Sequence, residues 1–273
     1  MIFVITGATS FVGLEFTRLA LECGHNVYAV CRSSSSSLGK LPKDDALTIV
    51  FASMDEYGRL PEKIPYADVF VNFAWDGTTY EGRVRADIHQ KNIDNTKTAI
   101  RVANKIGCKL FVESGSQAEY GVFDGIIEES TPCQPFTEYG KAKLAVKESG
   151  FRLSEELNIK YLHLRIFSTY GANDHPYTLF MNVVEKMSKN APLDLSPCTQ
   201  NWNFLYVRDV VKQIYLLIEK AFNDAVFSNE VFNVASEDTR TLTNYIERIK
   251  EILHSSSELH YGAFVPEHLV TLN

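Results

Sequence analysis

The chain has 273 residues, and at roughly 150 residues per domain this length predicts one large domain or two unequal ones. Hydrophobic residues make up 45% and charged residues 22%, values typical of a globular protein, which excludes a disordered chain. The 27 basic and 34 acidic residues give a net charge of −7 without a basic cluster, so we expect no nucleic-acid partner. No run of about 18 apolar residues occurs, so we also expect no membrane span.

Cysteine and histidine spacing indicates neither disulfides nor a metal site. The 5 cysteines are scattered without C-x-x-C, and the 7 histidines include no H-E-x-x-H, so we expect no bound metal. The apolar segment at residues 1–5 follows no basic residue and ends at Thr6, which is too short for a signal peptide. These features predict a protein of the reducing cytoplasm.

Short apolar segments alternate with longer amphipathic ones along the first 170 residues. This alternation is typical of a parallel sheet with helices on both faces. We expect strands at residues 2–5, 27–31, 47–51, 69–73, 110–112 and 161–167, and helices at residues 11–23, 84–106 and 139–157. The predicted fold is therefore α/β, with a Rossmann-type doubly wound dinucleotide-binding domain over residues 1–170.

The pattern changes after residue 170, where prolines at 176, 192 and 197 interrupt the chain. Helical spacing is found at residues 179–189, 207–220 and 242–253, and a strand-like segment at residues 231–234. We expect residues 171–273 to form a smaller substrate-binding lobe that is interwoven with the sheet domain. The five serines at positions 33–37 indicate a flexible loop.

The first predicted strand is followed by a turn of small residues and then by a helix. Backbone N–H groups at such a helix N-terminus bind a pyrophosphate, because a turn without bulky side chains lets the ligand approach. The alternative is a tight turn without a ligand. Ser10 stands where a glycine is more common, and its hydroxyl can bond a phosphate. The candidate cofactor residues in this turn are Gly7, Thr9, Ser10, Phe11, Val12 and Gly13.

The end of the second predicted strand indicates which dinucleotide is bound. An acidic residue here holds the ribose of NAD, whereas an arginine accommodates the 2′-phosphate of NADP. The chain has Arg32 and Ser33 at this point, and no acidic residue before Asp44. We therefore favour NADP over NAD; the alternative is a solvated arginine before a flexible loop.

Tyr139 and Lys143 lie one helical turn apart, at the start of the helix that precedes the sixth strand. A segment rich in serine, residues 113–121, directly follows the fifth predicted strand and reads as a loop. Because the carboxyl ends of parallel strands meet at one edge of a sheet, these residues are expected to share a ligand crevice. The alternative is a surface pair and an ordinary loop serine.

Together these features resemble the extended short-chain dehydrogenase/reductase superfamily, the NAD-dependent epimerase/dehydratase-like enzymes of sugar nucleotides. The matching segments are residues 6–13, Asn72-Phe-Ala-Trp75, Asn92-Ile-Asp-Asn-Thr96, the serine loop that ends in Tyr120-Gly121, Tyr139-x-x-x-Lys143, and residues 164–171. The resemblance implies that Ser116, Tyr139 and Lys143 are catalytic. It also implies cofactor contacts from Phe73, Ala74, Trp75 and Ile166, as well as from Tyr139 and Lys143.

The chemistry that this resemblance implies follows from the groups themselves. Positive charges near a phenol favour its phenolate, so Tyr139 can act as a general acid or base beside Lys143. Ser116 would hydrogen-bond the reacting oxygen, and Lys143 would also hold the nicotinamide ribose. The hydride belongs to the cofactor.

The residues after Ser116 discriminate among sugar-nucleotide reactions. Dehydratases of the family carry two acidic residues there, but this chain has Gln117 and Ala118, neither of which transfers a proton. The segment is similar to that of nucleotide-sugar 4-ketoreductases of the CDP-abequose synthase type, which implies NADPH-dependent reduction of a 4-keto-6-deoxyhexose. A 4-epimerase and a non-catalytic NADP-binding module remain as alternatives. Strand-like alternation directs Glu119 away from Ser116, which indicates a structural role.

The same resemblance implies that the second lobe binds the nucleotide sugar. The candidate substrate residues are Trp75, Gln117, Ser168, Trp202 and Asn203. Relatives continue beyond the point that corresponds to Pro266, so we expect part of the substrate lid to be missing from this chain. The helices at residues 84–106 and 139–157 correspond to those that pair in relatives, which predicts a homodimer.

Overall fold

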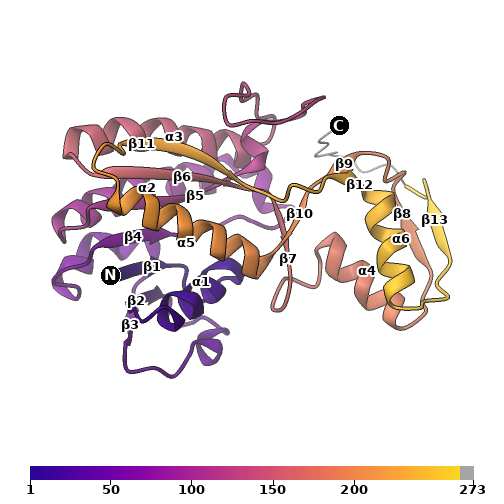
Figure 1. Cartoon of the computed structure of the whole chain (residues 1–273), viewed down its shortest axis with the longest axis horizontal. Coiled ribbons are helices and arrows are strands. Elements are labelled where there is room, and N and C mark those ends of the chain that lie inside the picture. Colours follow the sequence, from indigo (N-terminus) through magenta and orange to yellow (C-terminus); the bar gives the residue numbers. More distant parts are fainter. Residues whose placement is uncertain (265–273) are drawn as a thin grey trace.

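The computed structural model describes residues 1–264 and is built around one seven-stranded sheet (Figure 1). All neighbouring strands in this sheet run parallel, in the order β11-β6-β5-β4-β1-β2-β3. The strands are β1 (Ile2–Thr6), β2 (Asn26–Cys31), β3 (Leu47–Phe51), β4 (Val69–Asn72), β5 (Leu110–Ser116), β6 (Lys160–Ile166) and β11 (Asn229–Val234). The predicted doubly wound α/β fold is confirmed.

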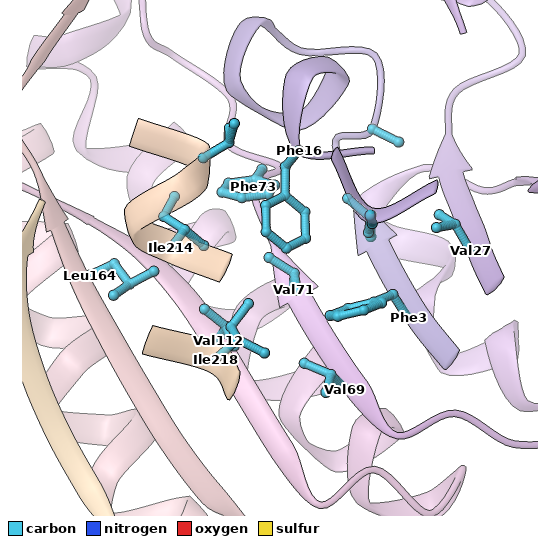
Figure 2. Packing of buried hydrophobic residues seen from close by; sticks show 14 of the residues in the cluster. Phe3, Phe16, Val27, Val69, Val71, Phe73, Val112, Leu164, Ile214 and Ile218 are labelled. Carbon is cyan, nitrogen blue, oxygen red and sulfur yellow. The ribbon is translucent and has the colours of Figure 1, made fainter. Parts of the chain in front are cut away.

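One face of the sheet is covered by α1 (Phe11–Glu22) and α5 (Val207–Asn223), which also pack on each other. Figure 2 shows the apolar core on this face, where Phe3, Phe16 and Phe73 lie together. The centroid of the Phe16 ring lies 5.8 Å from that of Phe3 and 5.6 Å from that of Phe73, and both contacts are edge-to-face. This packing fixes α1 against the ends of β1 and β4.

The opposite face is covered by α2 (Ala86–Lys105), α3 (Glu138–Leu157) and the 3-10 helix η2 (Met54–Glu62). Here Phe70, Phe111 and Tyr161 lie in register on neighbouring strands and stack at 5.3 and 5.5 Å between ring centroids. Two residues further along these strands, and on the neighbouring β1, lies a row of polar residues that is equally buried. Its members are Thr6, Asn72, Glu113 and His163. Polar side chains in such a place must bond each other.

The lobe at the right of Figure 1 has its own small apolar core between α4 (Leu179–Ser188), α6 (Leu242–Ile252) and strand β8 (Leu193–Leu195). Strand β13 (Leu259–Tyr261) pairs with β8. Two further pairs connect this lobe to the sheet: β7 (Ser168–Tyr170) with β10 (Phe204–Tyr206), and β9 (Asn201–Trp202) with β12 (Arg240–Thr241).

The predicted elements agree with the structure apart from a few ends. The strand predicted at residues 110–112 continues to Ser116, because its polar residues are buried between β4 and β6. The helix predicted from Val84 begins at Ala86. The chain returns from the lobe to the sheet, where α5 packs on one face and β11 pairs with β6, and we propose that the lobe is interwoven with the sheet domain. We propose the domain boundary near residue 170 on this basis.

Two expectations concern the C-terminal segment and the oligomeric state. The segment after Pro266, on which the missing lid was predicted, lies outside the described residues. The predicted homodimer remains a prediction. Within residues 1–264, no helix has the length and apolar character needed to cross a membrane, and no cluster of His, Cys, Asp and Glu side chains is arranged to hold a metal ion.

We predict that Gly13→Ala lowers the free energy of unfolding by about 3 kcal/mol, measured by urea denaturation. A Cβ at Gly13 would lie 2.2 Å from the backbone oxygen of Gly7, and no side-chain rotation relieves a clash with backbone. The control is Gly58→Ala, because Gly58 is exposed and has no atom within 4 Å of the added carbon. Equal stability of the two variants would contradict the close approach of α1 to the β1 turn.

Candidate active site

A cleft of about 1680 Å³ lies along the carboxyl ends of the sheet strands and extends to the second lobe. It collects most of the residues that the sequence singled out. The predicted residues that line it are Gly7, Thr9, Ser10, Phe11, Val12, Arg32, Phe73, Ala74, Trp75, Ser116, Gln117, Tyr139, Lys143, Ile166, Ser168 and Trp202. Ligand crevices of parallel sheets form at this edge, where the loops diverge.

The turn between β1 and α1 has the form expected of an anion site. Gly7 has φ +64, and a Cβ there would lie 2.8 Å from the Ala74 nitrogen, so only glycine suits this position. Ser10 is the N-cap of α1 and accepts a bond from the Gly13 nitrogen at 3.2 Å. No acidic residue stands in the first turn of α1, so its N-terminus favours an anion. Gly13 itself does not line the cleft; it allows α1 to approach the turn.

Arg32 directly follows β2, its side chain is 65% exposed, and its guanidinium lies 3.7 Å from the Asp76 carboxylate. Ser35, not Ser33, completes this part of the cleft: its hydroxyl donates to Thr9 Oγ1 at 3.0 Å, whereas the exposed Ser33 is not part of the lining. The predicted cofactor contact of Ser33 remains a prediction, while the serine loop brings Ser35 to the β1 turn. A basic group beside hydroxyls suits a phosphate.

Lys143 is buried, and its ammonium meets three different groups. Nζ donates to the Ser114 carbonyl at 2.5 Å, lies 3.6 Å from the centre of the Trp75 ring, and is 3.7 Å from Glu113 Oε1. An indole face and a carboxylate both stabilise a cation. Burial raises the pKa of Glu113 to about 7, against the opposing effect of Lys143 and of the Asn72 amide.

Tyr139 stands one turn before Lys143, in an aromatic and cationic environment. Its ring packs edge-on against Trp75 at 6.0 Å and against His89 at 5.8 Å between centroids. The Arg83 guanidinium lies 4.8 Å from the ring centroid and the Lys143 ammonium 5.9 Å. Tyr139 lines the cleft beside these cations, where its hydroxyl can exchange a proton with a bound ligand.

Ser116 ends β5 and is held by Glu119 in a capping box. The Ser116 N–H donates to Glu119 Oε1 at 2.8 Å, and its hydroxyl accepts from the Ala118 nitrogen at 3.2 Å, which leaves the hydroxyl proton available. His163 and Arg165 bond the same carboxylate at 2.9 and 3.0 Å. Burial alone would raise the pKa of Glu119, but these partners hold it below its usual value.

Two expectations for the serine segment need correction. Residues 113–116 belong to β5 and residues 117–119 to the 3-10 turn η4, so the segment is not a loop. Strand-like alternation therefore does not apply to Glu119, whose carboxylate turns back to the backbone of Ser116. Its role is structural, as expected, but through direct contact with the serine.

Three of the predicted substrate residues meet where the two lobes face each other. The Ser168 hydroxyl accepts from Gln117 Nε2 at 3.2 Å and from Trp202 Nε1 at 2.8 Å. Gln117 Oε1 is buried without a hydrogen-bond partner among residues 1–264. This oxygen is an acceptor that a ligand hydroxyl can satisfy.

The predicted substrate contact of Asn203 remains a prediction, and in this structure the side chain is used within the fold. Its amide donates to the Ser236 carbonyl at 2.7 Å and to Thr239 at 3.0 Å, while its oxygen accepts from the Ser236 nitrogen at 2.9 Å. Asn203 is buried and outside the cleft lining. It fastens β10 to the segment after β11, because a buried amide must satisfy all its bonds.

Sequence reasoning missed Glu113, Arg83 and His89. Glu113 gave a signal, since an acidic residue at the carboxyl end of a buried strand is unusual. Arg83 and His89 gave none, because they precede or begin α2 and reach Tyr139 only through the tertiary fold. His89 Nε2 and Trp75 Nε1 are both buried without a hydrogen-bond partner in the described part of the chain.

Comparison with known proteins identifies the family. The family model "NAD dependent epimerase/dehydratase family" matches residues 3–235. The chain belongs to this family. It is thus a member of the extended short-chain dehydrogenase/reductase superfamily, as its motifs suggested.

Two relatives match most of this chain. The chain is 25% identical over 268 residues to CDP-abequose synthase of Salmonella muenchen, covering 95% of this chain and 83% of that protein. It is 23% identical over 253 residues to dTDP-6-deoxy-L-talose 4-dehydrogenase (NAD(+)) of Aggregatibacter actinomycetemcomitans, covering 89% and 87%.

Solved structures share the fold. UDP-glucose 4-epimerase of Thermotoga maritima, with UDP-glucose, has a TM-score of 0.86 at 22% identity. The match covers 100% of this chain and 90% of the epimerase chain. UDP-glucuronic acid 4-epimerase of Bacillus cereus, with UDP-glucuronic acid and NAD, has a TM-score of 0.84 at 18% identity, covering 100% and 89%. At these identities the likeness shows the fold alone.

We predict that Glu113→Gln becomes more stable relative to the wild type as pH rises. The pKa of Glu113 is about 7 in the folded protein and 4.5 in the ordinary carboxyl, so the folded state favours the neutral form. Its contribution to stability is present below about pH 4.5 and is lost as pH rises through about 7. Urea denaturation at several pH values should show a relative change of up to about 3 kcal/mol. A stability difference that does not vary with pH would contradict the raised pKa.

Proposed function

We propose that the protein reduces the 4-keto group of a nucleotide-diphospho-4-keto-6-deoxyhexose with NADPH. The observation that carries this proposal is that one cleft is lined by Ser116, Tyr139 and Lys143 and by Gln117 and Trp202, which both donate to the Ser168 hydroxyl. The CDP-abequose synthase relatives support the substrate class.

The residues of the β1 turn suit the cofactor. The backbone of residues 7–12 would hold the pyrophosphate, since a Cβ at Gly7 would fill the approach and the N-terminus of α1 favours an anion. Arg32 and Ser35 would hold the 2′-phosphate of NADP. The bound cofactor supplies the hydride.

The protein's own groups supply the proton and the orientation. Tyr139 donates its hydroxyl proton to the ketone oxygen as the carbonyl carbon accepts the hydride, so the ketone becomes an alcohol and the cofactor is oxidised. The free proton of the Ser116 hydroxyl bonds the same oxygen. Lys143 favours the phenolate that Tyr139 leaves, because an ammonium nearby stabilises the negative charge.

The groups beside Ser116 disfavour elimination of water. Gln117 is an amide and Ala118 is apolar, so neither supplies the acid or base of a dehydratase. A 4-epimerase would use the same three residues and is the second candidate, favoured by the fold shared with UDP-sugar epimerases. The two differ in a simple way: a reductase consumes one NADPH per sugar, whereas an epimerase consumes none.

We predict that Tyr139→Phe lowers kcat about a thousandfold, because general acid catalysis by one positioned group contributes about 10²–10⁴. The measurement is the loss of NADPH absorbance with CDP- or dTDP-linked 4-keto-6-deoxyhexoses. Tyr66→Phe is the control, since Tyr66 lies outside the cleft lining and bonds Asp68. An unchanged rate in Tyr139→Phe would show that another group donates the proton.

We predict that Arg32→Ala weakens binding of NADPH at least about tenfold while NADH binding changes little, because only NADPH carries the 2′-phosphate that a charge-assisted pair would hold. Dissociation constants measured by titration of the purified protein with each cofactor test this. Equal weakening of both cofactors would contradict the preference for NADP.

A further inference from the structure

Glu113 is a buried charge that the reaction above does not use. Its side chain has no exposed surface, and Oε1 has no hydrogen-bond partner among residues 1–264, although the Lys143 ammonium lies 3.7 Å away. A carboxyl group that only filled space would be replaced at lower cost by an apolar side chain, since burying a charge is unfavourable unless it is paired. Its orientation toward Lys143 therefore calls for a function.

The carboxylate is held in place by the polar row of the sheet. Asn72 Nδ2 donates to Glu113 Oε2 at 2.7 Å, and Thr6 Oγ1 donates to Asn72 Oδ1 at 2.6 Å. These bonds leave Oε1 directed at the ammonium from strand β5, while Trp75 closes the other side at 3.6 Å. Lys143 is thus confined between a carboxylate, a carbonyl and an aromatic ring.

We infer that Glu113 is a positioning residue for Lys143: its carboxylate holds the ammonium beside Tyr139, and cofactor binding therefore depends on the ionisation of Glu113. This inference rests on the proposed function only in that Lys143 is taken to contact the cofactor. Glu113 itself touches neither the cofactor nor the sugar; it acts through Lys143.

The charged and titratable groups around Glu113 come from four elements. Lys143 faces it from α3, Glu119 acts on it from η4, and the phenols of Tyr57 on η2 and Tyr161 on β6 are close enough to interact with it. His163 on β6 lies in register with Glu113, and its ring bonds the Glu119 carboxylate. Both phenols have raised pKa values because they are buried, so they stay neutral near pH 7. Lys143 is thus the cation whose position responds when Glu113 ionises.

Glutamine at position 113 imitates the protonated carboxyl. Its amide oxygen can still accept from Asn72, but it carries no charge for Lys143. We therefore expect wild type and Glu113→Gln to bind the cofactor alike at low pH and to differ at high pH. At high pH the ionised carboxylate therefore lowers the free energy of unfolding and raises the affinity of the protein for the cofactor.

The test measures NADP⁺ binding between about pH 5.5 and 8.5, without any sugar, by quenching of Trp75 fluorescence. The chain has 2 tryptophans, so a Trp202→Phe background isolates this signal. In that background the affinity should rise about tenfold through pH 7, the change expected when the charge of one group shifts an equilibrium by one pK unit. With Glu113→Gln added, the affinity should stay at the low-pH value throughout.

Two further variants separate positioning from simple stability. Tyr161→Phe removes a buried, unpartnered hydroxyl from the same sheet face and should keep the pH step, because it leaves Lys143 in place. Lys143→Gln should abolish the step, since no ammonium remains to be held, and it serves as the test if Glu113→Gln does not fold. Loss of the step in Tyr161→Phe, or its persistence in Glu113→Gln or Lys143→Gln, would overturn the inference.

These outcomes are independent of the sugar reaction. A pH step that vanishes in Glu113→Gln, together with no NADPH consumption on any 4-keto sugar, would support the role of Glu113 and reject the reductase. NADPH consumption with a pH step that persists in Glu113→Gln would do the reverse.

Discussion

The buried ammonium of Lys143 is the interaction on which the cleft depends. Removing a charge from water is costly, and the protein compensates with the Ser114 carbonyl, the Trp75 ring and the Glu113 carboxylate, all within 4 Å. These three groups come from β5 and from the loop after β4, so the ammonium ties α3 to the strand ends. Tyr139 is placed by the same helix, one turn earlier, which couples its position to that of Lys143.

Two buried carboxylates, one before and one after Gly115 in the sequence, have different contacts at the end of β5. Glu113 faces Lys143, whereas Glu119 holds the backbone of Ser116 and is itself paired with His163 and Arg165. Glycine between them is required, because a Cβ at Gly115 would lie 2.6 Å from the Glu119 carboxylate and 2.3 Å from the His163 ring. Sheet packing and catalytic geometry therefore depend on one short segment, residues 113–119.

Hydrophobic periodicity predicted the apolar strands and the helices, because it is a local feature. The three catalytic candidates came from the resemblance to the extended short-chain dehydrogenase/reductase superfamily. Periodicity failed where polar residues are buried. Glu113 to Ser116 read as loop, although pairing with β6 makes them strand. Ser33 and Ser35 were indistinguishable in a run of serines until the loop brought Ser35 to Thr9. Such distinctions depend on tertiary contacts, which spacing does not encode.

The central claim is that this cleft transfers a hydride from a nicotinamide cofactor to the C4 carbonyl of a nucleotide-linked 4-keto sugar. The most direct measurement uses NADPH deuterated at the transferable C4 position, with mass and NMR analysis of the sugar product. We predict one deuterium bound at C4 of the sugar and one NADP⁺ formed per product. A product without deuterium, formed with no net oxidation of NADPH, would contradict it.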